Sequence, residues 1–172
     1  MGTPGSRLVL VEGVSDRVAL ETLARRRGLE PPEIVVLGGA FALGKILSGA
    51  PRDAEWVGLC DAAEERSFRR YLTQVHVCVP DLEGELIRAL GAERVLEVID
   101  AQGELSSFRT LQLQPALAGR SREAQLTRFL GGRSGNKARY ARLFVEALDL
   151  DRVPGPLDAS LGLSSRGSGT GG

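Results

Sequence analysis

The chain has 172 residues, enough for one compact domain but short of what two independent hydrophobic cores need. Its 22 basic and 22 acidic residues cancel, which excludes a global positive field for nucleic acid, so any such contact must be local or metal-assisted. Two cysteines without a Cys-x-x-Cys pair, one histidine and no apolar run of ~18 residues argue against structural zinc and against a membrane span. The N-terminal segment lacks a signal-peptide pattern, so the expected location is the cytoplasm.

Strands alternate with helices in the first half of the chain. The apolar run 7–11 predicts a strand that is buried on both faces, followed by a helix capped by Ser15 or Asp16. The further expected elements are a strand at 34–37, a short helix at 41–47, a strand at 56–60, a helix at 64–72 and a strand at 75–79. This order predicts an α/β fold with a mainly parallel sheet and right-handed crossovers.

After Pro80 the pattern becomes mostly helical. Helices are expected at 82–90, 125–129 and 137–148, with one possible strand near 95–99. The expected domain organisation is a folded domain at 1–157, with a core at about 7–91, a helical extension at 92–157, and a flexible tail at 158–172 that is rich in Gly and Ser.

Three acidic residues follow the predicted strands at their carboxyl ends: Glu12, Asp16 and Asp61. Ligands of open parallel sheets bind at this edge, where gathered carboxylates raise one another's pKa unless a cation lies between them. Oxygen ligands without His or Cys favour Mg²⁺ or Mn²⁺, and the chemistry expected of such a site is phosphoryl transfer. The alternative is that Glu12 is a turn residue, Asp16 a helix cap and Asp61 a solvated strand end.

The segment 10–16, Leu-Val-Glu-Gly-Val-Ser-Asp, resembles the opening motif of Toprim domains, in which Glu-Gly-x-x-Asp follows an apolar strand. Asp61 matches the second acidic motif of that family in position. Segments 80–86 and 135–141 resemble the acidic and Gly-x-Lys segments of the OLD (overcoming lysogenization defect) nucleases. The resemblance covers about residues 8–157. It implies the Toprim fold, a Rossmann-like, mainly parallel sheet flanked by helices, with a helical C-terminal half.

The resemblance also implies a function, a Mg²⁺- or Mn²⁺-dependent DNA endonuclease that uses two-metal hydrolysis. Two groups of carboxylates would each hold one metal ion: Glu12 with Asp61, and Asp16 with Glu83 or Glu85. Lys137 would face the scissile phosphate and neutralise the charge that develops there. The catalytic residues so implied are Glu12, Asp61 and Lys137, and the implied partner is nucleic acid, with DNA expected before RNA.

The sequence departs from this family at the third strand. Toprim enzymes usually carry Asp-x-Asp there, whereas this chain has Asp61-Ala62-Ala63 followed by Glu64. Glu64 is the nearest replacement ligand, although a ligand displaced by one residue points in a different direction. The alternative function is therefore a catalytically weak or inactive Toprim module that binds nucleic acid or a protein partner. One such partner is a separate ATPase, because OLD nucleases carry an ATPase domain ahead of the Toprim domain.

Two further patterns are less specific. Segment 39–46 matches the Gly-x4-Gly-Lys of a P-loop, but Ile46 stands where Ser or Thr would bind Mg²⁺, so a helix core is the preferred interpretation. Arginines around Lys137 are compatible either with a phosphate-binding face or with a solvated helix surface; they are Arg120, Arg122, Arg128, Arg133, Arg139 and Arg142.

Overall fold

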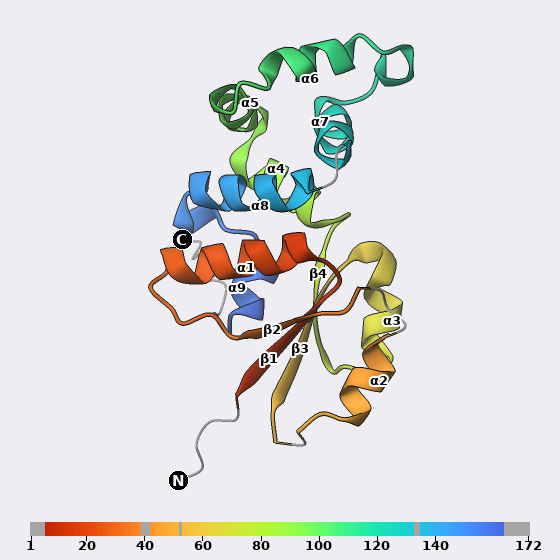
Figure 1. Ribbon diagram of the computed structural model, residues 1–172, viewed down its shortest axis with the longest axis vertical. Helices are drawn as coiled ribbons and strands as arrows, with labels where there is room; N and C mark the ends of the chain where they lie inside the picture. The colour runs from red at the N-terminus through yellow and green to blue at the C-terminus, as the bar shows by residue number, and fades with distance from the viewer. Residues whose placement is uncertain (1–5, 39–41, 52, 133–134, 164–172) are drawn as a thin grey trace, which may run out of the picture.

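A four-stranded sheet forms the centre of the protein in the computed structural model (Figure 1), which describes residues 6–38, 42–51, 53–132 and 135–163. The strand order is β2-β1-β3-β4, and every neighbouring pair is parallel. The strands are β1 Arg7–Val11, β2 Glu33–Val36, β3 Glu55–Asp61 and β4 Gln74–Cys78. The predicted α/β fold with a parallel sheet is confirmed.

Helices make up most of the rest of the described chain. They are α1 Val14–Arg26, α2 Leu43–Ser48, α3 Glu65–Arg69, α4 Leu82–Leu90, α5 Ala92–Ala101, α6 Leu105–Gln112, α7 Arg122–Gly131, α8 Asn136–Ala147 and α9 Gly155–Ser160. Short 3₁₀ turns lie at η2 Ala62–Glu64, η3 Pro115–Leu117 and η4 Leu150–Arg152. Over the described ranges, no helix combines the length and the apolar character that crossing a membrane requires.

Side chains alternate between the two faces of the sheet, as extended strands require. Val9, Val11 and Leu59 pack into the larger core, which they share with residues of α1, α4 and α8. Leu10 and Cys60 pack into a smaller core with residues of α2 and α3. Figure 1 shows α1, α8 and α9 on one side of the sheet and α2 and α3 on the other. Because both faces are covered, the central strands are apolar between their ends, at 8–11 in β1 and at 56–60 in β3.

The connections place the topological switch point between β1 and β3. The chain leaves β1 through α1, on one face of the sheet, and pairs β2 with one side of β1. It then returns through α2, on the opposite face, and pairs β3 with the other side of β1. Ligands of open α/β sheets bind at this point, beyond the carboxyl ends of the strands. Glu12 follows β1 here, and Asp61 ends β3.

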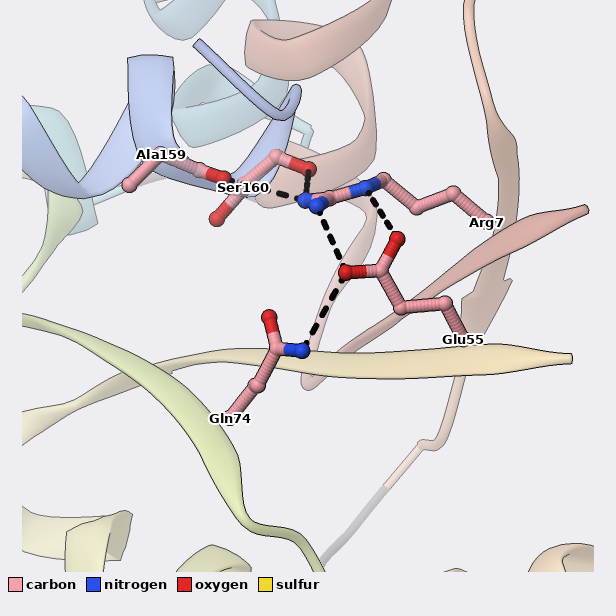
Figure 2. A network of polar contacts seen from close by, with 5 residues as sticks. All are labelled: Arg7, Glu55, Gln74, Ala159 and Ser160. Atoms are coloured by element: carbon pink, nitrogen blue, oxygen red, sulfur yellow. Dashed lines mark hydrogen bonds and ion pairs between the residues drawn. The ribbon is translucent and has the colours of Figure 1, made fainter. Parts of the chain in front are cut away.

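The C-terminal helix α9 is tied to the opposite, N-terminal end of the strands (Figure 2). Nη2 of Arg7 lies 2.9 Å from Oε1 of Glu55, and Nη1 of Arg7 donates to the carbonyl oxygens of Ala159 (3.1 Å) and Ser160 (3.2 Å). Gln74 donates to the same Glu55 carboxylate at 3.1 Å. The network joins β1, β3, β4 and α9 away from the switch point.

The folded chain continues past residue 157, where the flexible tail was expected to begin. Asp158 accepts hydrogen bonds from Nε (2.8 Å) and Nη2 (2.7 Å) of Arg27, and the side chains of Leu157 and Ser160 are fully buried. The predicted boundary therefore cuts through α9 and is wrong for residues 158–160. Residues 161–163 continue α9 in a hydrogen-bonded turn, and the rest of the predicted tail, 164–172, lies outside the described residues.

The expected strand near 95–99 is also wrong, because these residues belong to α5. Val95 and Ile99 are both fully buried, and their spacing places them on one face of a helix that packs against α4 and α8. The five-residue run Val-Leu-Glu-Val-Ile fits a strand period as well as a helix period. Packing against the neighbouring helices decides the outcome, and the sequence pattern alone does not contain that information.

Several helix boundaries differ from their predictions; the helix expected at 125–129, for example, is α7 and extends from Arg122 to Gly131. The N-cap of α1 is Gly13, so Ser15 and Asp16 lie inside the first turn instead of capping it. The helix expected at 64–72 begins as the 3₁₀ turn η2 and ends at Arg69. The helix expected at 41–47 corresponds to α2. Residues 39–41, which include the first residue of that expected helix and the start of the P-loop-like segment, lie outside the described ranges.

Helices α4 to α8 form the helical C-terminal half. Figure 1 shows α5, α6 and α7 extending beyond α4 and α8 on the side away from the sheet. Edge-on and tilted aromatic contacts, with ring centroids 5.4 to 6.3 Å apart, join α6, α7 and α8 through Phe108, Phe129, Tyr140 and Phe144. Helix α8 also packs along α1 and against α4, which fixes its first turn beside the carboxyl edge of the sheet.

Gly58 in β3 allows the close approach of α3 to the sheet. A Cβ at this position would lie 2.6 Å from Cδ1 of Phe68 and 2.9 Å from Cδ1 of Leu72, and Phe68 is fully buried. We expect Gly58→Ala to lower the free energy of unfolding by about 1–3 kcal/mol, the usual cost of overpacking a core. Urea unfolding measures the change. Gly155→Ala is the matched control, since a Cβ there meets nothing within 4 Å; equal stability of the two variants would contradict the close packing.

Candidate active site

The carboxyl edge of the sheet holds a pocket of about 180 Å³ at the switch point. Five residues expected at the site come together here from four separate parts of the chain: the β1–α1 turn, the end of β3, and the first turns of α4 and α8. The lining residues are Glu12, Gly13, Ser15, Asp16, Asp61, Leu82, Glu83 and Lys137.

Strand register brings Glu12 to within one residue of Asp61 on the neighbouring strand. Val11, the last residue of β1, is aligned with Leu59 of β3, so the residues that follow them continue along neighbouring strands about 5 Å apart. Two carboxylates are therefore presented at the same edge by adjacent backbones. Continued in register, Glu12 lies level with Cys60, and a hydrogen bond between the Glu12 carboxylate and the backbone of Asp61 joins the two strand ends.

Asp16 is held against the turn that follows β1. Its Oδ2 accepts a hydrogen bond from the backbone N–H of Gly13 at 3.0 Å, which satisfies one of the free N–H groups at the start of α1. The residue is only 8% exposed. The hydrogen bond fixes the carboxylate in the pocket wall.

The β4–α4 connection brings Glu83 to the pocket. The backbone N–H of Leu82 donates to Oδ1 of Asp61 at 3.2 Å, and the N–H of Ala62 donates to the carbonyl of Pro80 at 3.0 Å. These bonds join the end of β3 to the start of α4. Glu83, in the first turn of α4, is 6% exposed and lines the same pocket as Asp61.

Lys137 supplies the positive charge of the pocket. It lies in the first turn of α8, and its Nζ is 3.5 Å from Oε1 of Glu83. Its side chain is about half exposed, at 52%, whereas that of Glu83 is at 8%. The ammonium group is therefore anchored on the acidic wall and still accessible to a ligand from solvent.

Burial and mutual repulsion raise the pKa values of three pocket carboxylates, Glu12, Asp16 and Asp61. Removal from water raises the pKa of Asp16 to about 7 and that of Asp61 to about 6, and neighbouring carboxylates add to both shifts. The pKa of Glu12 is also raised by burial, and a hydrogen bond with the backbone of Asp61 and the nearby Lys137 oppose this effect. The pocket accordingly disfavours its own negative charge, which a bound cation would relieve.

These shifts predict that the metal-free protein loses stability as pH rises. The pKa values of Asp16 and Asp61 lie above the ordinary carboxyl value of 3.8, so the folded state binds protons more tightly than the unfolded state between about pH 4 and 7. The stabilisation is present below that range and is lost as pH increases through it. We expect chemical unfolding in EDTA to give a lower free energy at pH 8 than at pH 5. In Asp16→Asn the difference in free energy of unfolding between pH 5 and pH 8 should be smaller. An unchanged difference would contradict the raised pKa of Asp16.

Two of the residues expected as metal ligands do not line the pocket. Oε1 of Glu85 accepts from the backbone N–H of Val79 at 3.1 Å, and its Oε2 lies 3.2 Å from Nη2 of Arg88. Glu64, in η2, raises the pKa of Glu12 through repulsion, so it lies near the pocket without forming its wall. Of the two glutamates offered as alternatives on α4, the structure brings Glu83 to Asp16.

Two residues at the site were missed by the sequence analysis as contributors. Asp81 caps α4 by accepting from the N–H of Gly84 at 2.8 Å, and its charge raises the pKa of Asp61. Ser15 presents a hydroxyl group to the pocket from the first turn of α1. The sequence signal for Asp81 was present, since Asp immediately before a helical run is a common N-cap.

The donor set suits a hard divalent cation. Among the described residues, no three His, Cys, Asp or Glu side chains converge closely enough to hold a metal ion by themselves. Mg²⁺ does not require such a group, because it is commonly bound through one or two carboxylates and completes its shell with water and substrate phosphate. Glu12 and Asp61, on adjacent strand ends, provide that minimum, and Asp16 and Glu83 surround them.

A parallel sheet with acidic residues at its switch point, followed by a helical C-terminal half, is consistent with a Toprim-like α/β fold. The chain matches the C-terminal region of the Burkholderia pseudomallei OLD protein with a TM-score of 0.64 and 16% sequence identity, over 92% of this chain and 96% of that one. It matches the C-terminal region of the Xanthomonas campestris pv. campestris OLD protein, in structures phased with iodine and with platinum, with TM-scores of 0.60 and 0.62. Identity is 18% in both, over 92% of this chain and 93% or 91% of theirs.

No family model and no curated protein matches the sequence. The structural matches cover nearly the whole chain at low identity, so they show a shared fold. The expected likeness to OLD-type Toprim domains is therefore confirmed at the level of the fold. The roles of individual residues rest on the geometry of the pocket.

Proposed function

We propose that this chain is the nuclease domain of a Mg²⁺- or Mn²⁺-dependent DNA endonuclease of the OLD-like Toprim type. The observation that carries the proposal is the pocket at the switch point, where four carboxylates and one lysine from distant parts of the chain surround about 180 Å³. The shared fold with the C-terminal regions of OLD proteins supports the same conclusion. A structural role alone does not account for four gathered carboxylates, of which Glu12, Asp16 and Asp61 have pKa values raised by burial.

Glu12 and Asp61 are the residues we assign to the first metal ion, and Asp16 with Glu83 to the second. A bound Mg²⁺ or Mn²⁺ supplies Lewis-acid stabilisation of the phosphate and lowers the pKa of bound water. Lys137, anchored at 3.5 Å from Glu83, points its ammonium group at the accessible side of the pocket and balances negative charge on the phosphate during cleavage. Glu85 has no part in this assignment, because its carboxylate is held by Val79 and Arg88.

The partners proposed with this function are DNA and a separate ATPase. The described pocket is open to solvent at Lys137, which suits a long polymer substrate better than a small enclosed one. The ATPase is proposed from the family resemblance.

Nicking of supercoiled plasmid tests the proposal. Purified protein with millimolar Mg²⁺ or Mn²⁺ is expected to convert supercoiled plasmid to nicked and linear forms, and EDTA is expected to stop the reaction. Glu93→Gln is the matched control for variants such as Glu12→Gln that remove a carboxylate from the pocket, because Glu93 is an exposed acidic residue on α5. Absence of cleavage with both metals would contradict the proposal.

A second candidate function is a Toprim module that binds nucleic acid or a protein partner without cutting it. It is favoured by the missing carboxylate at Ala63, since Glu64 does not take that place in the pocket wall. Binding of DNA without cleavage, under the plasmid conditions, would select this second function.

A further inference from the structure

A basic surface adjoins the acidic pocket at the end of β3. Six residues surround an open depression of about 530 Å³: Ala62, Ala63, Glu65, Arg66, Arg69 and Arg70. Asp61, which lines the acidic pocket, is the residue immediately before Ala62. The six residues around the depression are called the arginine surface. The acidic pocket and the arginine surface are therefore adjacent along the backbone, because Asp61 belongs to the first and Ala62 to the second.

The charge of the arginine surface is positive in a chain whose net charge is zero. Its lining carries three guanidinium groups against one carboxylate, and Arg69 is paired with Glu65 at 2.6 Å. Within the described residues, Arg66 makes no hydrogen bond or ion pair. The Arg70 guanidinium lies 5.8 Å from the ring centroid of Tyr71. Two exposed guanidinium groups are thus available to an anion at this place.

The arginines stand on a firmly packed support. Phe68, between Arg66 and Arg69 on α3, is fully buried, and Gly58 lets α3 approach β3 as closely as side chains permit. The position of α3 relative to the end of β3 is therefore set by the core. Guanidinium groups on such a support lose less freedom on binding than groups on a loose loop.

We propose that the arginine surface binds the phosphodiester backbone of DNA beside the acidic pocket. The inference rests on the proposed function, because it places the strand so that one phosphate reaches Lys137 and its neighbours lie over Ala62 and Ala63. A carboxylate at residue 63 would stand in this depression and repel a phosphate. Alanine removes that charge and leaves room, so the departure from Asp-x-Asp gives the chain a phosphate-binding subsite where a metal ligand would otherwise be.

DNA binding without cleavage tests the subsite. A labelled oligonucleotide duplex and its single strand are titrated with protein in EDTA at several salt concentrations. We expect the double variant Arg66→Gln/Arg70→Gln to bind about tenfold or more weakly at low salt, with a slope of log affinity against log salt that is flatter by about two. The control is Arg25→Gln/Arg152→Gln, which removes two exposed arginines near the other end of α1.

Ala63→Asp provides an independent test of the subsite, because it adds a negative charge to the arginine surface without removing an arginine. We expect it to weaken DNA binding in EDTA in the same direction. Thermal melting of each variant confirms that it is folded. Equal affinity and salt dependence of wild type and Arg66→Gln/Arg70→Gln would overturn the proposal, as would arginine-dependent binding of poly-glutamate in the absence of DNA binding. If wild type binds DNA through these arginines and does not cleave it, the subsite stands and the nuclease proposal falls.

Discussion

Replacing Glu12 by glutamine is expected to lower the rate constant of metal-dependent DNA cleavage by about 100-fold or more. Metal ions contribute several kcal/mol of transition-state stabilisation in phosphoryl transfer, and each 1.36 kcal/mol corresponds to about tenfold in rate. Glutamine keeps the size of the side chain and removes the charge that holds the cation beside Asp61. Single-turnover cleavage at saturating protein, with Mn²⁺ varied, separates a loss of metal affinity from a loss of rate.

The stability of Glu12→Gln gives this prediction a second check. Removing one charge from a repelling group of buried carboxylates should leave the metal-free protein at least as stable as wild type at pH 8. The same variant should gain less stability than wild type from added Mn²⁺, since ligands that bind only the folded state stabilise it by mass action. Wild-type cleavage in Glu12→Gln would show that Glu12 is not a metal ligand.

Lys137→Ala is expected to reduce cleavage by about 100-fold while changing DNA affinity by only a fewfold. A group that meets the phosphate mainly as charge develops affects the rate constant, whereas a general backbone contact affects affinity and its salt dependence. Binding isotherms at several salt concentrations, measured beside single-turnover cleavage, separate the two effects. Lys45→Ala is the matched control, because Lys45 is the other lysine of the sequence and lies exposed on α2.

The variant Lys137→Ala also leaves the buried Glu83 carboxylate without its lysine. A loss of folding is therefore checked by thermal melting at the assay temperature before the rates are compared. Equal losses in binding and cleavage would reassign Lys137 to ordinary backbone contact. No loss in either would place it on a solvated helix surface.

Much of the fold was predictable because the strands are buried on both faces. A continuous apolar run such as 7–11 has few alternatives once it is too short for a helix, and the alternation with helices fixes parallel pairing. The placement of Glu12 and Asp61 then followed from the rule that the carboxyl ends of parallel strands share one edge. The order of the strands, which makes that edge a switch point, came only from the structure.

The choice between Glu83 and Glu85 could not be made from the sequence. Residues two apart on a helix differ in direction by about 200°, so only one of the pair can face the pocket. Which one does so depends on how α4 is rotated against β4 and α8. The buried face of the helix, with Leu82, Leu86 and Ile87, sets that rotation and turns Glu83 inward.

The arginine surface escaped the sequence analysis for a related reason. A net charge of zero says nothing about where charges gather, and Arg66, Arg69 and Arg70 read as an ordinary solvated helix. Their proximity to the end of β3 depends on the 3₁₀ turn η2, which shortens the path from Asp61 to α3. The sequence pattern indicated a possible phosphate-binding face at the arginines around Lys137 instead, of which Arg133 lies outside the described residues.

Calorimetric titration of Mn²⁺ into the purified protein at pH 8 tests the central claim most directly, because it requires neither DNA nor a second subunit. We expect saturable binding by wild type, loss of that binding in the Glu12→Gln/Asp61→Asn double variant, and unchanged binding in the Glu93→Gln control. Binding should also weaken from pH 8 to pH 5.5, since protons compete for Asp16 and Asp61 with raised pKa values near 7 and 6. Absence of binding by wild type at millimolar Mn²⁺, or equal binding by wild type and the double variant, would contradict a metal site at the end of β1 and β3.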